Sequence, residues 1–433
     1  MRENFNPFEK SFIEAKEKDL ELLKSVAEGW YVEYKREKQN GKKIAKSISS
    51  FANSHGGIYF IGIEADSSTN CAKDFIGVND SPDVIRDSVR GNLQPFPYFE
   101  TFSINLSNGK KVLMAVISEG NNPPYIHSDG RIYRRQEAAS DPISENNRYT
   151  IDELYRKALE FEEEIENFRA FDLTFCKGEE NIPYLEIYVN TTPFNHFKIT
   201  DFFKKENLEK ILQQFNGAFD ISETGISVSY TGNMKFDTLT TYYNSVSIRH
   251  LEQQNLAYNG LTIEIDRSGN LKLLIPLTEK DYYSKALAER YKNVITLSQE
   301  DTIYSIRFLD VRNIFATILG LINNYVKYLN EKKYGDKLEF KLKLRNCYRT
   351  TLYIDSEDFF EHVENFGIPI CGKEEQYFPK HSISMNFQDI ISHPITKVAD
   401  LFFNVANALG VPLYVAVSVI SEIYKNPQPP SSS

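Results

Sequence analysis

Two adjacent glycines followed by a run of apolar residues place the strongest constraint on the fold of this chain. Residues 58–63 (Ile-Tyr-Phe-Ile-Gly-Ile) are almost continuously apolar, which is typical of a strand buried on both faces of a sheet. Residues 42–52 have the apolar spacing of a helix, and Gly56-Gly57 permits the positive φ angles that end it. A helix that leads into such a strand predicts an α/β domain.

The hydrophobic pattern continues this alternation on both sides. Strand-like segments are rich in β-branched and aromatic residues, and Asn108-Gly109 is a dipeptide typical of hairpin turns. The predicted helices are 11–26, 42–52 and 84–92, and the predicted strands are 31–35, 58–64, 99–106, 111–118 and 132–134. We therefore expect an N-terminal α/β domain with a mixed sheet.

The chain after residue 167 predicts an α+β region. Its expected elements are a hairpin over 261–275, an amphipathic helix over 311–329, a strand over 338–344, and helices over 396–409 and 413–424. The uncharged stretch 401–421 is long enough to span a membrane. Gly410 and Pro412 interrupt it, which favours a broken pair of buried helices, so we expect no membrane partner.

Charge divides the chain into two parts. The formal net charge is −10, and residues 1–160 hold 22 Lys and Arg against 24 Asp and Glu, so most of the excess lies beyond residue 160. We expect a domain over 1–160, an acidic linker or helix end at 161–167, an α+β region over 168–425 and a disordered tail at 426–433. A chain this acidic is not a general polycation, so binding to nucleic acid requires a local basic surface or metal ions.

The cysteines and the N-terminus indicate the compartment. Cys71, Cys176, Cys347 and Cys371 are scattered without C-x-x-C spacing, which argues against a structural zinc site and a disulfide scaffold. The first residues lack the apolar segment of a signal peptide. We expect a cytoplasmic protein.

Carboxylates gather around two of the predicted strands. Glu33 and Lys35 project from one face of strand 31–35, because residues i and i+2 share a face, and Glu28 lies at its entrance. Glu64 and Asp66 follow at the carboxyl end of the next strand, where sites in α/β sheets tend to lie. Neighbouring carboxylates suit Mg²⁺ or Mn²⁺. A Glu-x-Lys triplet is also common on a solvent-facing edge strand.

Basic residues form two clusters in the same part of the chain. The first cluster is Lys35, Arg36, Lys38, Lys42, Lys43 and Lys46, and the second is Arg131, Arg134 and Arg135.

His55 lies in the turn before the two glycines. It is a candidate base or a structural residue.

Taken together, these motifs resemble the Schlafen family. The resemblance rests on E-x-x-x-x-E-Y-K at 28–35, on A-x-S-I-S-S-F-A-N-S-H-G-G-x-Y-F-I-G-I-E at 45–64 and on a late I-Y-R-R strand at 132–135. The same pattern is similar to prokaryotic Schlafen-like proteins with an Alba-like (AlbA_2-type) nucleic-acid-binding domain. It extends over about residues 15–158.

The resemblance implies a three-carboxylate site that binds Mg²⁺ or Mn²⁺ and cleaves tRNA and related RNA. Glu28, Glu33 and Glu64 are the implied ligands, with Asp66 as an alternative third ligand and Lys35 as a further catalytic residue. A metal in this site would generate hydroxide near neutral pH. The implied nucleic-acid-binding residues are Lys35, Arg36, Lys38, Arg131, Arg134 and Arg135.

Our leading hypothesis is therefore a metal-dependent endoribonuclease that cleaves tRNA or other structured RNA, with a toxin-like role in antiphage defence. The C-terminal region would respond to an unknown trigger or protein partner, or form a homo-oligomer. The alternatives are a non-catalytic DNA- or RNA-binding regulator and a metal-dependent nuclease that acts on DNA. An ATP-binding module is a further alternative, against which the absence of a Walker-type loop argues.

Overall fold

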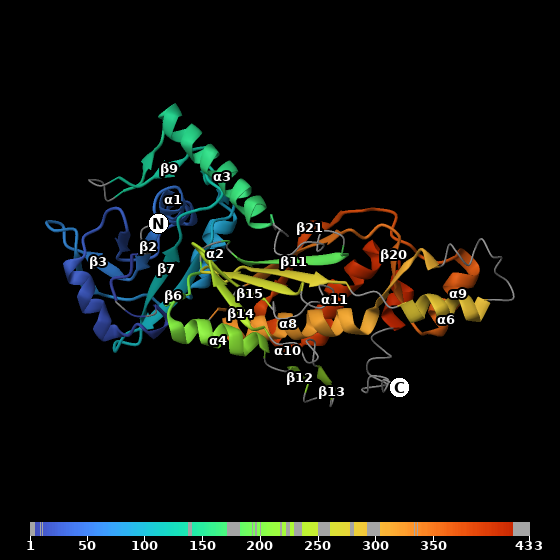
Figure 1. Ribbon diagram of the computed structural model, residues 1–433. Helices are drawn as coiled ribbons and strands as arrows, with labels where there is room; N and C mark the ends of the chain where they lie inside the picture. Colours follow the sequence, from blue (N-terminus) through green and yellow to red (C-terminus); the bar gives the residue numbers. More distant parts are fainter. Residues whose placement is uncertain are drawn as a thin grey trace. The chain divides into compact units, whose positions relative to one another are not determined.

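A computed structural model of the chain divides into two compact units, residues 1–170 and 171–433 (Figure 1). Both units mix helices and strands, and the fold class is α+β, as predicted. The structure describes residues 5–8, 10, 12–136, 141–170, 182–192, 194, 197–199, 201–216, 219–221, 226–228, 236–249, 260–277, 281–291, 304–332, 334–335 and 337–418. The predicted tail at 426–433 and Cys176 lie outside this part of the chain.

A four-stranded mixed sheet forms the centre of the N-terminal unit. Its strand order is β1-β2-β7-β6, with the bounds β1 (Val32–Lys35), β2 (Gly57–Ile61), β7 (Lys111–Ile117) and β6 (Phe99–Asn105). Strands β1 and β2 are parallel, and the other neighbours are antiparallel. The connection between β1 and β2 contains helix α1 (Gly41–Ala52), as a parallel pair requires. The mixed sheet and the hairpin around Asn108-Gly109 confirm the prediction.

Both faces of this sheet are covered, which explains the apolar run of β2. Helix α1 and helix α2 (Asp83–Arg90) pack on one face, against Tyr59 and Ile61. Leu20 and Leu23 pack on the other face, against Ile58 and Phe60. The predicted helix at 11–26 is instead a pair of 3₁₀ segments, η1 (Phe12–Glu14) and η2 (Glu17–Ser25). Their i→i+3 bonds include the one from the Asp19 N–H to the Lys16 carbonyl.

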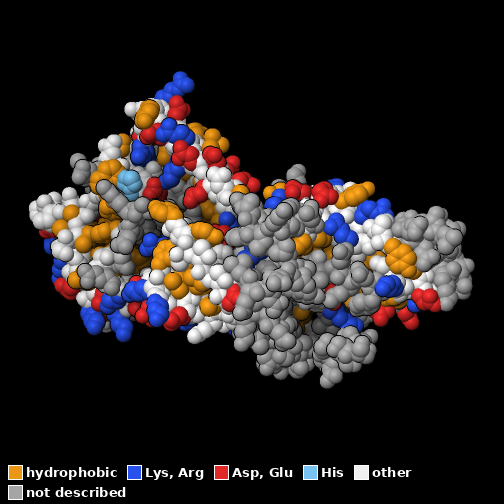
Figure 2. Space-filling view, viewed as in Figure 1, with side chains coloured by type: hydrophobic (Ala, Val, Ile, Leu, Met, Phe, Trp, Pro, Cys, Tyr) orange, Lys and Arg blue, Asp and Glu red, His pale blue; other side chains and the backbone are white. Residues whose placement is uncertain are grey.

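Short strand pairs and one long helix complete the unit. The pairs are β3 (Ile63–Ala65) with β4 (Ala72–Phe75), β5 (Leu93–Gln94) with β8 (Ile126–His127), and β9 (Tyr133–Arg134) with β10 (Ile143–Ser144). Helix α3 (Arg148–Phe168) contains the acidic segment 161–167. Basic and acidic side chains both lie at the surface of this part of the unit (Figure 2), and Leu154 is the buried residue of α3.

The C-terminal unit is built on a seven-stranded antiparallel sheet. Its strand order is β14-β15-β16-β17-β11-β19-β21. The bounds are β14 (Thr238–Thr241), β15 (Ser245–Arg249), β16 (Thr262–Asp266), β17 (Leu271–Pro276), β11 (Tyr184–Thr192), β19 (Lys337–Arg345) and β21 (Gln376–Asn386). The predicted hairpin over 261–275 is the pair β16–β17.

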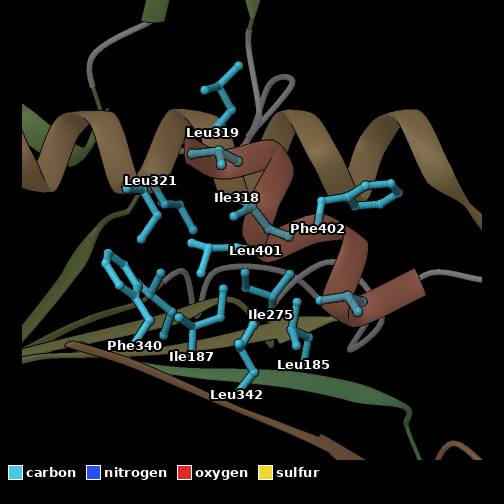
Figure 3. Close-up of a cluster of buried hydrophobic side chains, with 14 of the residues drawn as sticks. Leu185, Ile187, Ile275, Ile318, Leu319, Leu321, Phe340, Leu342, Leu401 and Phe402 are labelled. Atoms are coloured by element: carbon cyan, nitrogen blue, oxygen red, sulfur yellow. The ribbon is translucent and has the colours of Figure 1, made fainter. Parts of the chain in front are cut away.

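Alternate residues of the central strands face the helices and form the largest core. Leu185 and Ile187 of β11 point toward α8 (Val311–Glu331) and α11 (Pro394–Ala408), whose Ile318 and Phe402 lie above them (Figure 3). Helices α4 (Lys205–Asn216) and α10 (Phe387–Ser392) also contact α8. The apolar stripe predicted over 311–329 therefore packs on the sheet, as an amphipathic helix should.

A smaller group of elements lies beside this core. Strands β18 (Arg307–Asp310) and β20 (Thr350–Tyr353) are parallel. The remaining elements are β12 (Phe219–Ile221), β13 (Ile226–Val228), α6 (Asp281–Tyr291) and α9 (Glu357–Phe366). The stretch 401–421 is broken at Gly410, which has a φ of +92°. Residues 413–418 are helical again, as predicted, and the rest of the predicted helix, 419–424, lies outside the described residues. No helix in the described part of the chain is long and apolar enough to cross a membrane.

Candidate nucleic-acid interface

The parallel pair β1–β2 brings the two groups of predicted site residues to one end of the sheet. Lys35 of β1 lies opposite Ile61 of β2, and the Gly62 N–H donates to the Lys35 carbonyl over 2.7 Å. Arg36 directly follows β1, and its Nη1 lies 3.1 Å from the Glu64 Oε1 of β3. The N-terminus of α1 begins at Gly41, shortly after the end of β1.

Glu33 is the centre of a buried charge network. Its side chain is 1% exposed, and its Oε1 lies 2.9 Å from the Lys35 Nζ and accepts the Ser47 hydroxyl over 2.8 Å. Its Oε2 accepts the Arg135 Nη1 over 2.9 Å. Ser47 comes from α1 and Arg135 follows β9, so this network joins three segments of the fold. We refer to Lys35, Glu33 and Arg135 as the buried triad.

Arg135 is held by more than the carboxylate of Glu33. Its Nε and Nη2 donate to the Gly29 carbonyl over 2.8 and 2.6 Å, and its guanidinium lies 4.6 Å from the centre of the Phe51 ring. Its backbone N–H donates to the Ser54 hydroxyl over 3.0 Å. The side chain is fully buried, so Arg135 cannot take part in the predicted nucleic-acid-binding surface and instead fixes the fold around β1.

Lys35, the most exposed member of the triad, and the nearby Glu28 both have a raised pKa. Burial alone would lower the pKa of Lys35, but the charge and hydrogen bond of Glu33 outweigh it and raise that pKa, so Lys35 stays protonated. Glu28 is half-buried, and its Oε1 accepts the Tyr34 backbone N–H over 2.6 Å. Burial raises the pKa of Glu28, against the opposing effects of this hydrogen bond and of Lys35. Glu28 also interacts through its charge with Lys35, Glu33 and Arg135, the three members of the buried triad.

Glu64 and Asp66 have partners outside this network. Glu64 pairs with Arg36 at the surface. Asp66 Oδ1 accepts hydrogen bonds from the backbone N–H groups of Ser68 and Thr69, over 2.8 and 3.0 Å, and from the Ser68 hydroxyl. The hydrogen bonds from Ser68 and Thr69 lower the pKa of Asp66 to about 2. Asp66 is thus the acceptor of its own turn, a common role for Asp.

The donor set does not fit a metal ion held by three carboxylates. Among the described residues, no three side chains of His, Cys, Asp or Glu gather in a way that could hold a metal. Glu33 is occupied by two cations and a hydroxyl, Glu64 by Arg36, and Asp66 by its turn.

Residues 28–144 match the family model of the Schlafen AlbA_2 domain. The N-terminal unit therefore carries a Schlafen AlbA_2 domain. This agrees with the resemblance found in the sequence, and it places β1, α1, β2 and the buried triad inside the matched segment. A comparison with curated proteins finds no significant match.

Two solved structures are similar to part of this chain. The DIP2311 protein of Corynebacterium diphtheriae is 19% identical over 26% of this chain and 26% of its own length, with a TM-score of 0.21. The N-terminal domain of a putative ATP-dependent DNA helicase RecG-related protein of Nitrosomonas europaea is 20% identical over 30% of this chain and 93% of its own length, with a TM-score of 0.23. The chain thus spans about a quarter of the length of the DIP2311 protein.

The remaining basic residues of the AlbA_2 domain differ in exposure. Arg36 and Lys38 are exposed after β1, where Lys38 Nζ lies 3.2 Å from the Asp80 Oδ1. Lys42 and Lys43 are exposed at the start of α1. Lys46 is half-buried, with its Nζ 4.8 Å from the centre of the Tyr133 ring. These cations follow the carboxyl end of β1.

The second basic cluster is divided by the fold. Arg131 is exposed, whereas the Arg134 Nη1 lies 3.4 Å from the Glu145 Oε2 in a half-buried pair. His55 is exposed, and its ring lies 5.4 Å from that of Trp30. Among the described residues, His55 contacts Trp30 and has no hydrogen bond or ion pair with the buried triad, so the geometry favours a structural role for this histidine.

Several residues that organise the AlbA_2 domain escaped the sequence reasoning. Ser47 lies on the buried face of α1, and Asn53 bonds the backbone of Tyr125 and Tyr133 through its side chain. Tyr59, opposite Glu33 on β2, has a buried hydroxyl with no hydrogen-bond partner among the described residues. A polar residue among the apolar positions of a predicted helix was the available signal for Ser47.

Proposed function

We propose that the AlbA_2 domain binds RNA through the exposed cations that follow β1. The observation that carries this is the grouping of Arg36, Lys38, Lys42 and Lys43 at the carboxyl end of β1 and the start of α1. Such cations neutralise backbone phosphates and release counterions. The match to the Schlafen AlbA_2 model supports a function connected with nucleic acids.

A pair of matched variants tests the location of this surface. Arg36 is 65% exposed and pairs with Glu64, and Arg156 on α3 is 61% exposed and pairs with Glu153 over 3.3 Å. We expect Arg36→Ala to weaken binding of the full chain to a bulk tRNA pool and to reduce its salt dependence by about one phosphate contact. We expect Arg156→Ala to bind as wild type does. Equal losses in both variants would refute the assigned surface.

Cleavage of the bound RNA is a second function that we propose for this site. The observation that favours it is the raised pKa of Glu28, beside the ammonium of Lys35. A carboxylate with a raised pKa is a better proton acceptor, and a fixed cation can stabilise charge that develops on a phosphate. In this proposal Glu28 accepts the proton of the attacking ribose 2′-hydroxyl, whose oxygen bonds to phosphorus as the bond from phosphorus to the 5′-oxygen breaks. Water protonates the leaving 5′-oxygen, and Lys35 contacts the phosphate.

The nuclease proposal is tested with bulk tRNA as substrate. Wild type, Glu28→Gln and Glu33→Ala are incubated in EDTA, in Mg²⁺ and in Mn²⁺, and products are separated on a denaturing gel. Products formed by wild type and lost in Glu28→Gln would support cleavage, and their dependence on the ion tests the prediction of Mg²⁺ or Mn²⁺. Equal products from all three proteins would refute it. Binding without products would favour the non-catalytic regulator.

The substrate and the biological role extend the same proposal. Structured RNA, with tRNA as its first candidate, remains our proposed substrate, and duplex DNA of equal length is the competitor that tests it. A toxin-like role in antiphage defence would require that expression of the active chain stops growth. For the C-terminal unit we propose a sensor or oligomerisation role. Light scattering of the full chain, with and without tRNA, measures its oligomeric state and so tests the oligomerisation role.

A further inference from the structure

The carboxylate of Glu33 has little capacity left for another ligand. A carboxylate offers about four lone-pair sites on its two oxygens. On Oε1, the ammonium of Lys35 and the hydroxyl of Ser47 occupy both positions, and on Oε2 the guanidinium of Arg135 occupies one. A divalent cation at Glu33 would therefore meet two positive charges at contact distance, or it would have to displace one of them.

Arg135 is not available for such a displacement. Its guanidinium also donates to the Gly29 carbonyl and lies over the Phe51 ring, and its backbone N–H is held by Ser54. The side chain is 0% exposed, so a guanidinium that left Glu33 would remain buried without a counterion. Buried charges of this kind are stable only when they are paired.

Lys35 is the member of the buried triad that reaches solvent. Its side chain is 24% exposed, against 1% for Glu33 and 0% for Arg135. Glu33 thus connects Arg135, a buried cation that is fixed in place, to Lys35, a cation that a phosphate group of a nucleic acid can approach from solvent. The bond to Glu33 fixes the direction of the Lys35 side chain, which would otherwise sample many rotamers.

We propose that Glu33 is a positioning residue that holds the ammonium of Lys35 as a phosphate contact, and that it is not a metal ligand. The proposal rests on the proposed RNA binding for the role of Lys35. It differs from the three-carboxylate site implied by the family resemblance, because the fold supplies Arg135 as the countercharge on the buried side of Glu33.

A double-mutant cycle separates positioning from a general structural role. Wild type, Glu33→Gln, Lys35→Met and the double variant, each as the full chain, are titrated with bulk tRNA in EDTA at several salt concentrations. We expect Lys35→Met to lower the affinity about three- to tenfold and to reduce the salt slope by about one contact. We expect Glu33→Gln to have a similar effect in the wild-type background and none in the Lys35→Met background. An equal loss in both backgrounds would overturn the proposal.

A gentler variant guards against misfolding of Glu33→Gln. Ser47→Ala removes one hydrogen bond from the Glu33 carboxylate and leaves all three charges of the triad in place. We expect it to weaken tRNA binding in the wild-type background and to have no effect beside Lys35→Met. A loss that persists beside Lys35→Met would count against positioning.

A second titration tests the metal directly. Mn²⁺ alone is titrated into wild type and Glu33→Gln, and binding is followed by calorimetry. We expect the two proteins to bind Mn²⁺ within threefold of each other, whether tightly or weakly. A tenfold or greater loss in Glu33→Gln would make Glu33 a ligand and overturn the proposal. A wild-type chain that binds no tRNA would overturn RNA binding together with the phosphate role of Lys35, whereas an uncoupled cycle would overturn the positioning alone.

Discussion

Glu33 and Arg135, which are 102 positions apart in the sequence, form an ion pair with 2.9 Å between Oε2 and Nη1, and both side chains are buried. The pair ties β1 to the segment that follows β9, across the end of α1. Such a pair depends on both partners, because removing one leaves an uncompensated charge in the interior.

Replacing Arg135 should therefore destabilise the N-terminal unit strongly. We expect Arg135→Met to lower the free energy of unfolding by about 3–5 kcal/mol, the range for breaking a buried pair. Trp30 is the single tryptophan of the chain and lies next to β1, so its fluorescence during urea unfolding reports on this unit. The control is Arg134→Met, whose side chain is 28% exposed and which should cost about 1 kcal/mol or less. Similar losses in the two variants would contradict the role of the pair.

The two buried tyrosines of β1 and β2 should respond oppositely to loss of the hydroxyl. The Tyr59 hydroxyl has no hydrogen-bond partner in the part of the chain that the structure describes, and burial and the charges of Glu33 and Glu28 raise its pKa. The Tyr34 hydroxyl donates to the Val26 carbonyl over 2.9 Å. We expect Tyr59→Phe to be neutral or stabilising and Tyr34→Phe to cost about 0.5–1.5 kcal/mol, measured by Trp30 fluorescence. Destabilisation by Tyr59→Phe would reveal a partner for its hydroxyl.

The turn around Asp66 should depend on pH at the acid end of the scale. The pKa of Asp66 is lowered to about 2, against about 3.9 in an unfolded chain. A lowered pKa means that the charged form stabilises the turn above about pH 4 and that this contribution is lost as the pH falls toward 2. Titration of the Asp66 carboxyl by NMR should give a midpoint near 2, and Ser68→Ala should raise it. A midpoint near 4 in the wild type would contradict these hydrogen bonds.

Gly56 should tolerate substitution much less than Gly109, although both have positive φ angles of +71° and +81°. A Cβ at Gly56 would lie 2.6 Å from the Ile117 carbonyl oxygen, whereas a Cβ at Gly109 meets nothing within 4 Å. We expect Gly109→Ala to cost about 1–2 kcal/mol from backbone strain alone, and Gly56→Ala about 2–4 kcal/mol because the clash adds to it. Equal costs in urea unfolding would show that β7 can move away from this turn.

Much of the AlbA_2 domain was predictable because its signals are local. The helical spacing of residues 42–52 and the apolar run of residues 58–63 predicted a helix that leads into a buried strand, and α1 and β2 confirm this prediction. Period-two alternation correctly placed Glu33 and Lys35 on one face of β1, since it follows from backbone geometry alone. The apolar spacing of residues 11–26 predicted an α-helix, but spacing alone does not distinguish an α-helix from the 3₁₀ helix that η2 forms.

The pairing of charged residues depends on the tertiary structure. The pattern of residues was enough to show that acids and bases cluster between Glu28 and Asp66, and that Arg135 lies in a second basic cluster with Arg131 and Arg134. It could not determine that Arg135 is buried against Glu33, or that Arg36 pairs with Glu64 while Asp66 bonds its own turn. The physical reason is that side-chain periodicity is set by neighbouring residues, whereas the partner of a charge depends on how segments far apart in the chain pack together.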